Sequence, residues 1–179
     1  MNSGIEIFRT RSRAQRISSP AKSSLETRIV GHRRFTAMAS ESRLYTFSPE
    51  TKDRLRKFRL TTSRASCPQA IIYQIDRKTL EISQEGDEVY TDLVELADQL
   101  PDNSPRFLLL SYPLTLASGR LSVPYVMINY LPPTCTSEMR MLYAGAKELV
   151  RNQSEAGRII EIDDASELET METRLKGEN

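Results

Sequence analysis

The most informative stretch of this chain is TSEMRMLYAGAKELVRN, which runs from Thr136 to Asn152. Placed at 100° per residue, its apolar side chains form one stripe, which predicts an amphipathic helix packed on a sheet, with Thr136 or Ser137 as its N-cap. The stripe contains Met139, Leu142, Tyr143, Ala146, Leu149 and Val150. The opposite side carries Arg140, Met141, Ala144, Glu148 and Arg151, flanked by Gly145 and Lys147.

Two residues on that outer side are unusual for a solvated surface. Met141 is apolar and flexible, and Gly145 costs a helix interior about 1 kcal/mol relative to Ala. With Ala144 they form a shallow patch that a second backbone could approach closely. Ordinary surface variation accounts for the same residues equally well, so both interpretations stay open at this point.

The rest of the chain predicts a mixed α+β (α/β) domain. Ser48-Pro49-Glu50 has the N-cap, first-turn proline and early acid of a helix start. Expected strands cover 70–75, 79–83, 107–112, 122–131 and 158–162, and expected helices cover 92–100 and 166–176. The continuous apolar runs at 107–112 and 122–131 indicate strands that are buried on both faces. We therefore expect a five-stranded mixed sheet with helices on both faces.

Charge divides the 179 residues into two parts. The whole chain has 25 basic and 24 acidic residues, but residues 1–40 hold eight basic and two acidic ones, a net charge of +6. Residues 41–179 therefore carry 17 basic and 22 acidic residues, a net charge of −5. The Ser- and Arg-rich composition of 1–40 predicts a disordered segment, and 41–179 is the expected domain.

Three explanations of the N-terminal segment are ranked in order. Because Met38 offers a plausible mature start, we first expect an upstream extension or a longer isoform. A mitochondrial transit peptide is second, and nucleic-acid contact is third. For the domain itself we expect no nucleic-acid partner, and the absence of a long apolar run predicts no membrane span.

The residue census removes most classes of enzyme. The single histidine, His32, lies in the N-terminal segment, and the 7 glycines form no phosphate-binding loop. Cys67 and Cys135 form no CxxC pair and predict a reduced, intracellular protein. The acidic groups at 85–88 and 163–164 lack calcium-loop spacing. We therefore expect no catalytic residue, metal or cofactor, and a protein that works by binding.

Residues 42 to about 162 resemble the actin-depolymerising-factor homology (ADF/cofilin-like) domain, and within it glia maturation factor of the fungal type. The resemblance is carried by four segments: Leu55-Arg56-Lys57-Phe58-Arg59, Ala70-Ile71-Ile72, Pro105-Arg106-Phe107 with Ser111-Tyr112, and Met141-Leu142-Tyr143-Ala144-Gly145-Ala146-Lys147. The Tyr-Ala-Gly-(Ser/Ala)-Lys part is specific, whereas the basic first helix alone would be weak.

The resemblance implies a cytoplasmic, monomeric protein of the cortical actin cytoskeleton that binds the actin-related protein 2/3 complex. It implies inhibition of nucleation and removal of branches, with the first actin subunit of the daughter filament as a further contact. The implied partner-binding residues are Ser42, Arg43, Leu44, Arg140, Met141, Tyr143, Ala144, Gly145 and Lys147. Tyr143 lies on the core stripe, so its expected role is to support the helix. A second surface for branch removal matches Ser118, Gly119 and Arg120, with Arg56, Lys57 and Arg59 contributing.

A cofilin-like protein that severs or depolymerises filaments is the alternative. Cofilin-type members carry basic residues where this chain has Glu138, and an acid there should repel acidic actin. The loop 113–119 has no charge, and the closing helix carries Glu167, Glu169 and Glu172, which also differs from cofilins. Phosphorylation of Ser40 or Ser42 would add negative charge beside the expected binding face and favour release.

Overall fold

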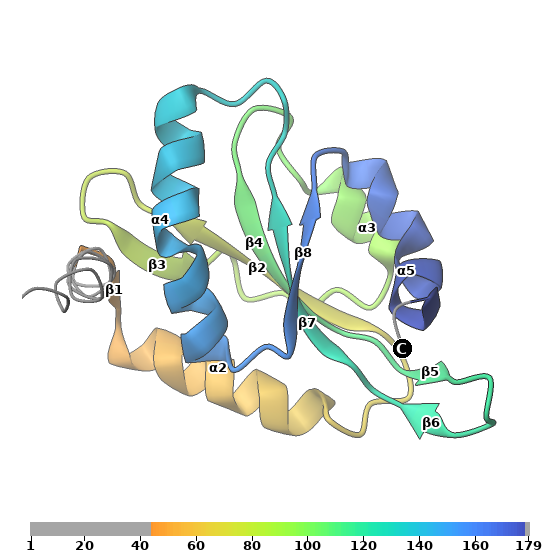
Figure 1. Cartoon of the computed structure of the whole chain (residues 1–179). Coiled ribbons are helices and arrows are strands. Elements are labelled where there is room, and N and C mark those ends of the chain that lie inside the picture. Colours follow the sequence, from red (N-terminus) through yellow and green to blue (C-terminus); the bar gives the residue numbers. More distant parts are fainter. Residues whose placement is uncertain (1–43, 178–179) are drawn as a thin grey trace, which may run out of the picture.

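The computed structural model describes residues 44–177, and the expectations for 1–40, Ser42 and Arg43 lie outside that range. Its main sheet has six strands in the order β1-β3-β2-β4-β7-β8 (Figure 1). These are β1 Thr46–Phe47, β2 Gln69–Ile75, β3 Glu81–Gln84, β4 Arg106–Ser111, β7 Tyr125–Tyr130 and β8 Arg158–Ile162. The two outer pairs, β1 with β3 and β7 with β8, are parallel, and the inner pairs are antiparallel.

The expected mixed sheet with helices on both faces is confirmed, but the expected number of five strands is wrong. The additional strand is β1, which pairs with β3 through Thr46 opposite Glu81. Two residues are too short to show the alternation that identifies a strand from sequence. Its partner β3 begins at Glu81 rather than at the expected residue 79, because Leu80 adopts a left-handed conformation with φ of 57°.

The expected strand 122–131 divides into two. Leu121–Ser122 forms β6, which pairs with β5 (Leu114–Thr115) in a separate two-stranded hairpin. Pro124 then precedes β7 and, lacking an N–H group, cannot donate a ladder hydrogen bond. The hairpin projects from the sheet at the lower right of Figure 1, on the far side of the molecule from most of α4.

Helices cover the two faces of the sheet separately. On one face lie α2 (Pro49–Thr62) and α4 (Ser137–Ser154), and on the other lie α3 (Leu93–Asp98), the 3₁₀ helix Ala165–Thr170 and α5 (Met171–Gly177) (Figure 1). The expected single helix 166–176 is therefore two elements. Asp164 and Glu167 form a capping box at the start of the 3₁₀ turn.

The core explains why the central strands read as continuous apolar runs. In β4, Leu108 and Leu110 pack toward α3 and α5, whereas Phe107 and Leu109 pack toward α2 and α4. All four side chains are fully buried. Since neighbouring residues of a strand point to opposite faces, only a strand covered on both sides can be apolar at every position.

Candidate functional site

The long helix α4 presents one face to the sheet and the other to solvent, as its sequence predicts. Thr136 is the N-cap, its hydroxyl accepting a hydrogen bond from the Met139 amide. Met139, Tyr143, Ala146 and Val150 are buried. Met141, in contrast, is 76% exposed. The helix ends two residues later than expected, where Glu155 takes a left-handed conformation.

Tyr143 belongs to the core and cannot touch a partner, which corrects its place among the contact residues. Its side chain is fully buried, its ring lies 4.8 Å from that of Phe107, and its hydroxyl accepts a hydrogen bond from the Ile75 amide at 3.1 Å. Burial raises the pKa of the Tyr143 hydroxyl above its usual value. The hydroxyl therefore joins α4 to β2, in agreement with the expected role of supporting the helix.

The space beside Gly145 is occupied by a side chain of the same protein. The Tyr45 hydroxyl donates a 2.7 Å hydrogen bond to the Leu142 carbonyl, in the turn of α4 before Gly145. A Cβ added to Gly145 would lie 2.7 Å from the Tyr45 oxygen and 3.5 Å from two of its ring carbons. The close approach that a helical glycine suggests is therefore made by Tyr45 of the same chain.

Tyr45 is the site residue that sequence reasoning missed. The signal that pointed toward it was the glycine itself, because a Gly in a helix interior marks a place where something lies too close for a methyl group. Nothing in the local sequence shows that the neighbour comes from 97 positions away in the chain.

Two exposed apolar side chains adjoin the Tyr45 contact. Leu44 is 57% exposed and immediately precedes Tyr45, and Met141 immediately precedes Leu142. The hydrogen bond thus ties the backbone next to Leu44 to the turn of α4 that follows Met141. Exposed apolar side chains are a feature of protein-binding surfaces.

The cations on this side of α4 are engaged within the chain. Arg140 donates to the carbonyl oxygens of Pro132 at 3.1 Å and Pro133 at 3.0 Å. Lys147 pairs with Glu161 on β8 at 2.8 Å, and this ammonium lowers the pKa of the Glu161 carboxyl. Ala144 is exposed between them. These contacts restrain the two cations and leave a low, partly basic rim around Met141.

Glu138 is not an isolated negative charge. Its carboxylate lies 3.2 Å from the guanidinium of Arg77, and both side chains are exposed. The pair is accessible to solvent, so its net contribution to stability is small. Arg77 nevertheless reduces the repulsion that the sequence alone predicts between Glu138 and an acidic partner.

The second expected surface lies on the β5–β6 hairpin. The Gly119 amide donates to the Leu116 carbonyl at 2.8 Å. Gly119 has φ of 79°, a backbone conformation that residues other than Gly rarely adopt. Ser118, Gly119 and Arg120 are exposed at this turn, and Leu121 beside them is 77% exposed. The expected loop is therefore an accessible hairpin tip with one cation and one apolar side chain.

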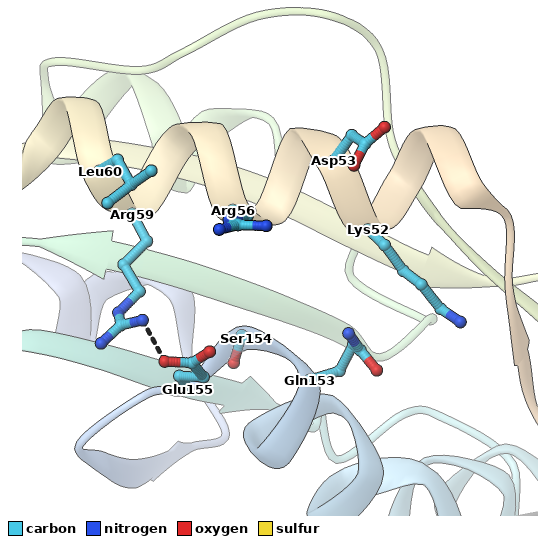
Figure 2. A pocket seen from close by; sticks show the side chains of 8 residues that line it. All are labelled: Lys52, Asp53, Arg56, Arg59, Leu60, Gln153, Ser154 and Glu155. Atoms are coloured by element: carbon cyan, nitrogen blue, oxygen red, sulfur yellow. Dashed lines mark hydrogen bonds and ion pairs between the residues drawn. The ribbon is translucent and has the colours of Figure 1, made fainter.

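The basic residues of α2 lie in a different place. Arg56 and Arg59 line a cavity of about 430 Å³ between α2 and the C-terminal end of α4, together with Lys52, Gln153 and Glu155 (Figure 2). Arg59 forms a salt bridge with Glu155 across this cavity. Lys57 is exposed on the same helix. The structure thus joins Arg56 and Arg59 to the end of α4, and no contact described here joins them to the hairpin tip.

Within residues 44–177 there is no group of three or more His, Cys, Asp or Glu side chains that could hold a metal ion. In the same range no helix is both long and apolar enough to cross a membrane.

Comparison with known proteins assigns the chain to a family. Residues 44–176 match the family described as cofilin/tropomyosin-type actin-binding protein. The chain belongs to this family. It is 38% identical over 146 residues to Protein AIM7 of Saccharomyces cerevisiae, covering 75% of this chain and 98% of that protein. It is 30% identical over 141 residues to glia maturation factor of Drosophila melanogaster, covering 76% of this chain and 99% of that protein.

A solved structure supports the same assignment. The solution structure of glia maturation factor from Caenorhabditis elegans aligns with a TM-score of 0.59 and 31% identity, covering 69% of this chain and 88% of that one. The expected resemblance to the actin-depolymerising-factor homology domain and to glia maturation factor is confirmed. Family membership places the chain among regulatory actin-binding proteins of the cytoplasmic cytoskeleton, a family that is not known for enzymes.

Proposed function

We propose that this protein binds the actin-related protein 2/3 complex, inhibits its nucleation of filaments and removes branches from the actin network. The supporting observations are two exposed apolar side chains: Met141 on α4, and Leu44, which immediately precedes the tyrosine whose hydroxyl bonds to α4. We call these two residues, with Arg140, Ala144 and Lys147 around them, the α4 surface. Ser42 and Arg43 would extend it, and they lie outside the described residues.

The composition of the α4 surface suits a protein partner. Exposed apolar anchors at the centre and polar or charged residues at the rim are the arrangement of protein interfaces, in which a few central side chains supply most of the affinity. Met141 and Leu44 would be the anchors. Arg140 and Lys147 would form the rim, where they contribute orientation and rate of association more than affinity.

The hairpin tip supplies a second, separate surface. Figure 1 shows β5 and β6 projecting away from α4, so a protein docked through the α4 surface keeps the hairpin free for another molecule. In this proposal the α4 surface docks on an actin-related subunit, and the hairpin tip presses on the first actin subunit of the daughter filament. Branch removal is then mechanical exclusion by a monomer, and it requires no covalent step. The place of action is the cortical actin cytoskeleton, including actin patches.

The first test measures binding of the full chain to purified actin-related protein 2/3 complex and, in parallel, to actin monomers. Binding to the complex with little binding to actin supports the proposal, and the reverse preference contradicts it. The double variant Arg140→Ala, Lys147→Ala should bind the complex more weakly. Arg174→Ala, Lys176→Ala is the matched control, since it removes one Arg and one Lys that are likewise engaged within the chain, here in salt bridges, from the opposite face of the sheet.

The two surfaces can be separated in one assay of branched networks. Arg120→Ala, Leu121→Ala should leave affinity for the complex unchanged and slow the loss of branches. Met141→Ala should reduce both. If the hairpin variant removes branches at the wild-type rate, the second surface is wrongly assigned.

A cofilin-like activity on filaments is the second candidate, and two observations favour it. Arg77 pairs with Glu138, which lessens the charge that would exclude actin. Two of the three acids of the closing segment are also paired, Glu167 with Arg174 and Glu172 with Lys176. Cosedimentation with filaments and faster fragmentation of filaments, with no binding to the actin-related complex, would establish this alternative.

A further inference from the structure

The contact between Tyr45 and Gly145 suggests a second reason for the glycine in α4. Tyr45 is the second of the described residues and immediately precedes β1, and its side chain contacts α4. Its side chain is half-buried, and its hydroxyl reaches the Leu142 carbonyl across 97 positions of sequence. From Thr46 onward the chain is held by pairing with β3, beginning with the Thr46 amide on the Leu80 carbonyl at 3.1 Å.

Leu44 lies just outside that strand pairing. Its own position relative to α4 depends on the residue that follows it, and that residue is fixed to α4 by one hydrogen bond and by ring packing over Gly145. The contact of Tyr45 with α4 therefore restrains the backbone next to Leu44.

We propose that Tyr45, accommodated by Gly145, is a positioning residue that anchors the backbone next to Leu44 to α4 and so fixes Leu44 for the partner. This inference rests on the proposed function for the identity of the partner. Tyr45 itself acts through Leu44. Gly145 acts by its lack of a side chain, which leaves room for Tyr45. In this proposal the space beside Gly145 is filled by Tyr45 and not by the backbone of a partner.

The geometry makes an unusual double-mutant prediction. In Gly145→Ala the new methyl group would lie 2.7 Å from the Tyr45 oxygen, so the tyrosine must move, which weakens its hydrogen bond to the Leu142 carbonyl. In Tyr45→Phe that oxygen is absent, and the nearest ring carbons lie 3.5 Å from the methyl position, an ordinary van der Waals separation. In the double variant the phenylalanine can therefore keep its place over the introduced methyl group, although the tyrosine cannot.

Affinity of the full chain for purified actin-related protein 2/3 complex tests this. We expect Gly145→Ala to weaken binding roughly 10-fold and Tyr45→Phe roughly 3-fold, the range set by the loss of one hydrogen bond and of its ordering effect. The double variant should bind about as well as Tyr45→Phe alone, so that Gly145→Ala causes no further loss of affinity in the Tyr45→Phe background. Tyr112→Phe is the matched control, because it removes a hydroxyl bonded to Glu172 at 3.2 Å on the opposite face of the sheet, and it should bind as wild type does.

Two results would overturn the inference. If Gly145→Ala binds as wild type does, Tyr45 has no positioning role. If the two losses multiply in the double variant, the methyl group acts on the partner directly and not through Tyr45. A purely structural role would lower the urea midpoint of unfolding in step with affinity, whereas positioning lowers affinity with the midpoint of Gly145→Ala unchanged or raised, because Ala favours the helix.

Failure of the proposed function gives a different pattern. If the wild-type chain does not bind the complex, that function is refuted, and the Tyr45 contact is tested by unfolding alone. The gain in urea midpoint from Gly145→Ala should then be larger in the Tyr45→Phe background than in wild type. Equal gains in both backgrounds would refute the contact itself.

Discussion

Replacing Tyr143 by Phe removes one oxygen atom from the core. It tests whether this residue of α4 stabilises the fold or contacts a partner. The Tyr143 hydroxyl accepts the Ile75 amide hydrogen at 3.1 Å, in a position without access to solvent. Without it, a buried backbone donor on β2 loses its side-chain acceptor, which costs about 1–3 kcal/mol. The aromatic packing against Phe107 is retained, so no further packing loss is expected.

Urea unfolding followed by circular dichroism measures this cost. We expect a lower midpoint with an unchanged slope, because the surface exposed on unfolding is the same. The control is Tyr112→Phe, which removes an exposed hydrogen bond and should change the free energy of unfolding by less than about 0.5 kcal/mol.

Binding gives the second half of this prediction. Folded Tyr143→Phe should bind the actin-related protein 2/3 complex with wild-type affinity, since the residue is buried. Met141→Ala should behave in the opposite way, with stability within about 0.5 kcal/mol of wild type and affinity reduced at least about 10-fold. The reasoning is refuted if Tyr143→Phe unfolds at the wild-type midpoint, or if it loses affinity while fully folded.

Three further predictions concern charge, capping and pH. Glu138→Lys should raise affinity for actin monomers several-fold in a fluorescence binding assay, because it replaces an acid with a cation opposite an acidic partner; no change would mean that Glu138 does not select against actin. Ser48→Ala should lower the free energy of unfolding by about 1 kcal/mol, because the Ser48 hydroxyl caps α2 by accepting from the Thr51 amide; the urea midpoint checks it. The Lys147 ammonium lowers the pKa of Glu161 in the folded protein. The Glu161 carboxylate therefore stabilises the fold above its unfolded pKa, and this stabilisation is lost as pH falls through the folded pKa. Glu161→Gln should accordingly lose less free energy of unfolding than wild type between about pH 5 and pH 3, measured by urea unfolding at each pH.

Much of the fold could be read from local pattern. The spacing of Met139, Tyr143, Ala146 and Val150 gave the buried side of α4, and Ser48 with Pro49 gave the start of α2. The unbroken apolar run in β4 indicated burial on both faces of the sheet. These features depend on side chains a few positions apart, which the sequence lists directly.

The elements that were predicted wrongly depend on strand partners or backbone conformations that a local sequence pattern does not contain. The two-residue strand β1 exists because β3 pairs with it, and the turn before β3 extends because Leu80 is left-handed. Pro124 divides one apolar run between two sheets. In each case, the deciding interaction lies outside the window in which periodicity can be seen.

The sequence by itself determined that the chain has an amphipathic α4 with an apolar Met141 and an interior Gly145 on its outer side. Only the tertiary structure decided what surrounds this side of the helix. It placed Tyr45 over Gly145, bonded the Tyr45 hydroxyl to Leu142, and paired Glu138 with Arg77. Each of these contacts joins residues more than 60 positions apart, and such contacts follow from the order of strands in the sheet and not from the spacing of residues along the chain.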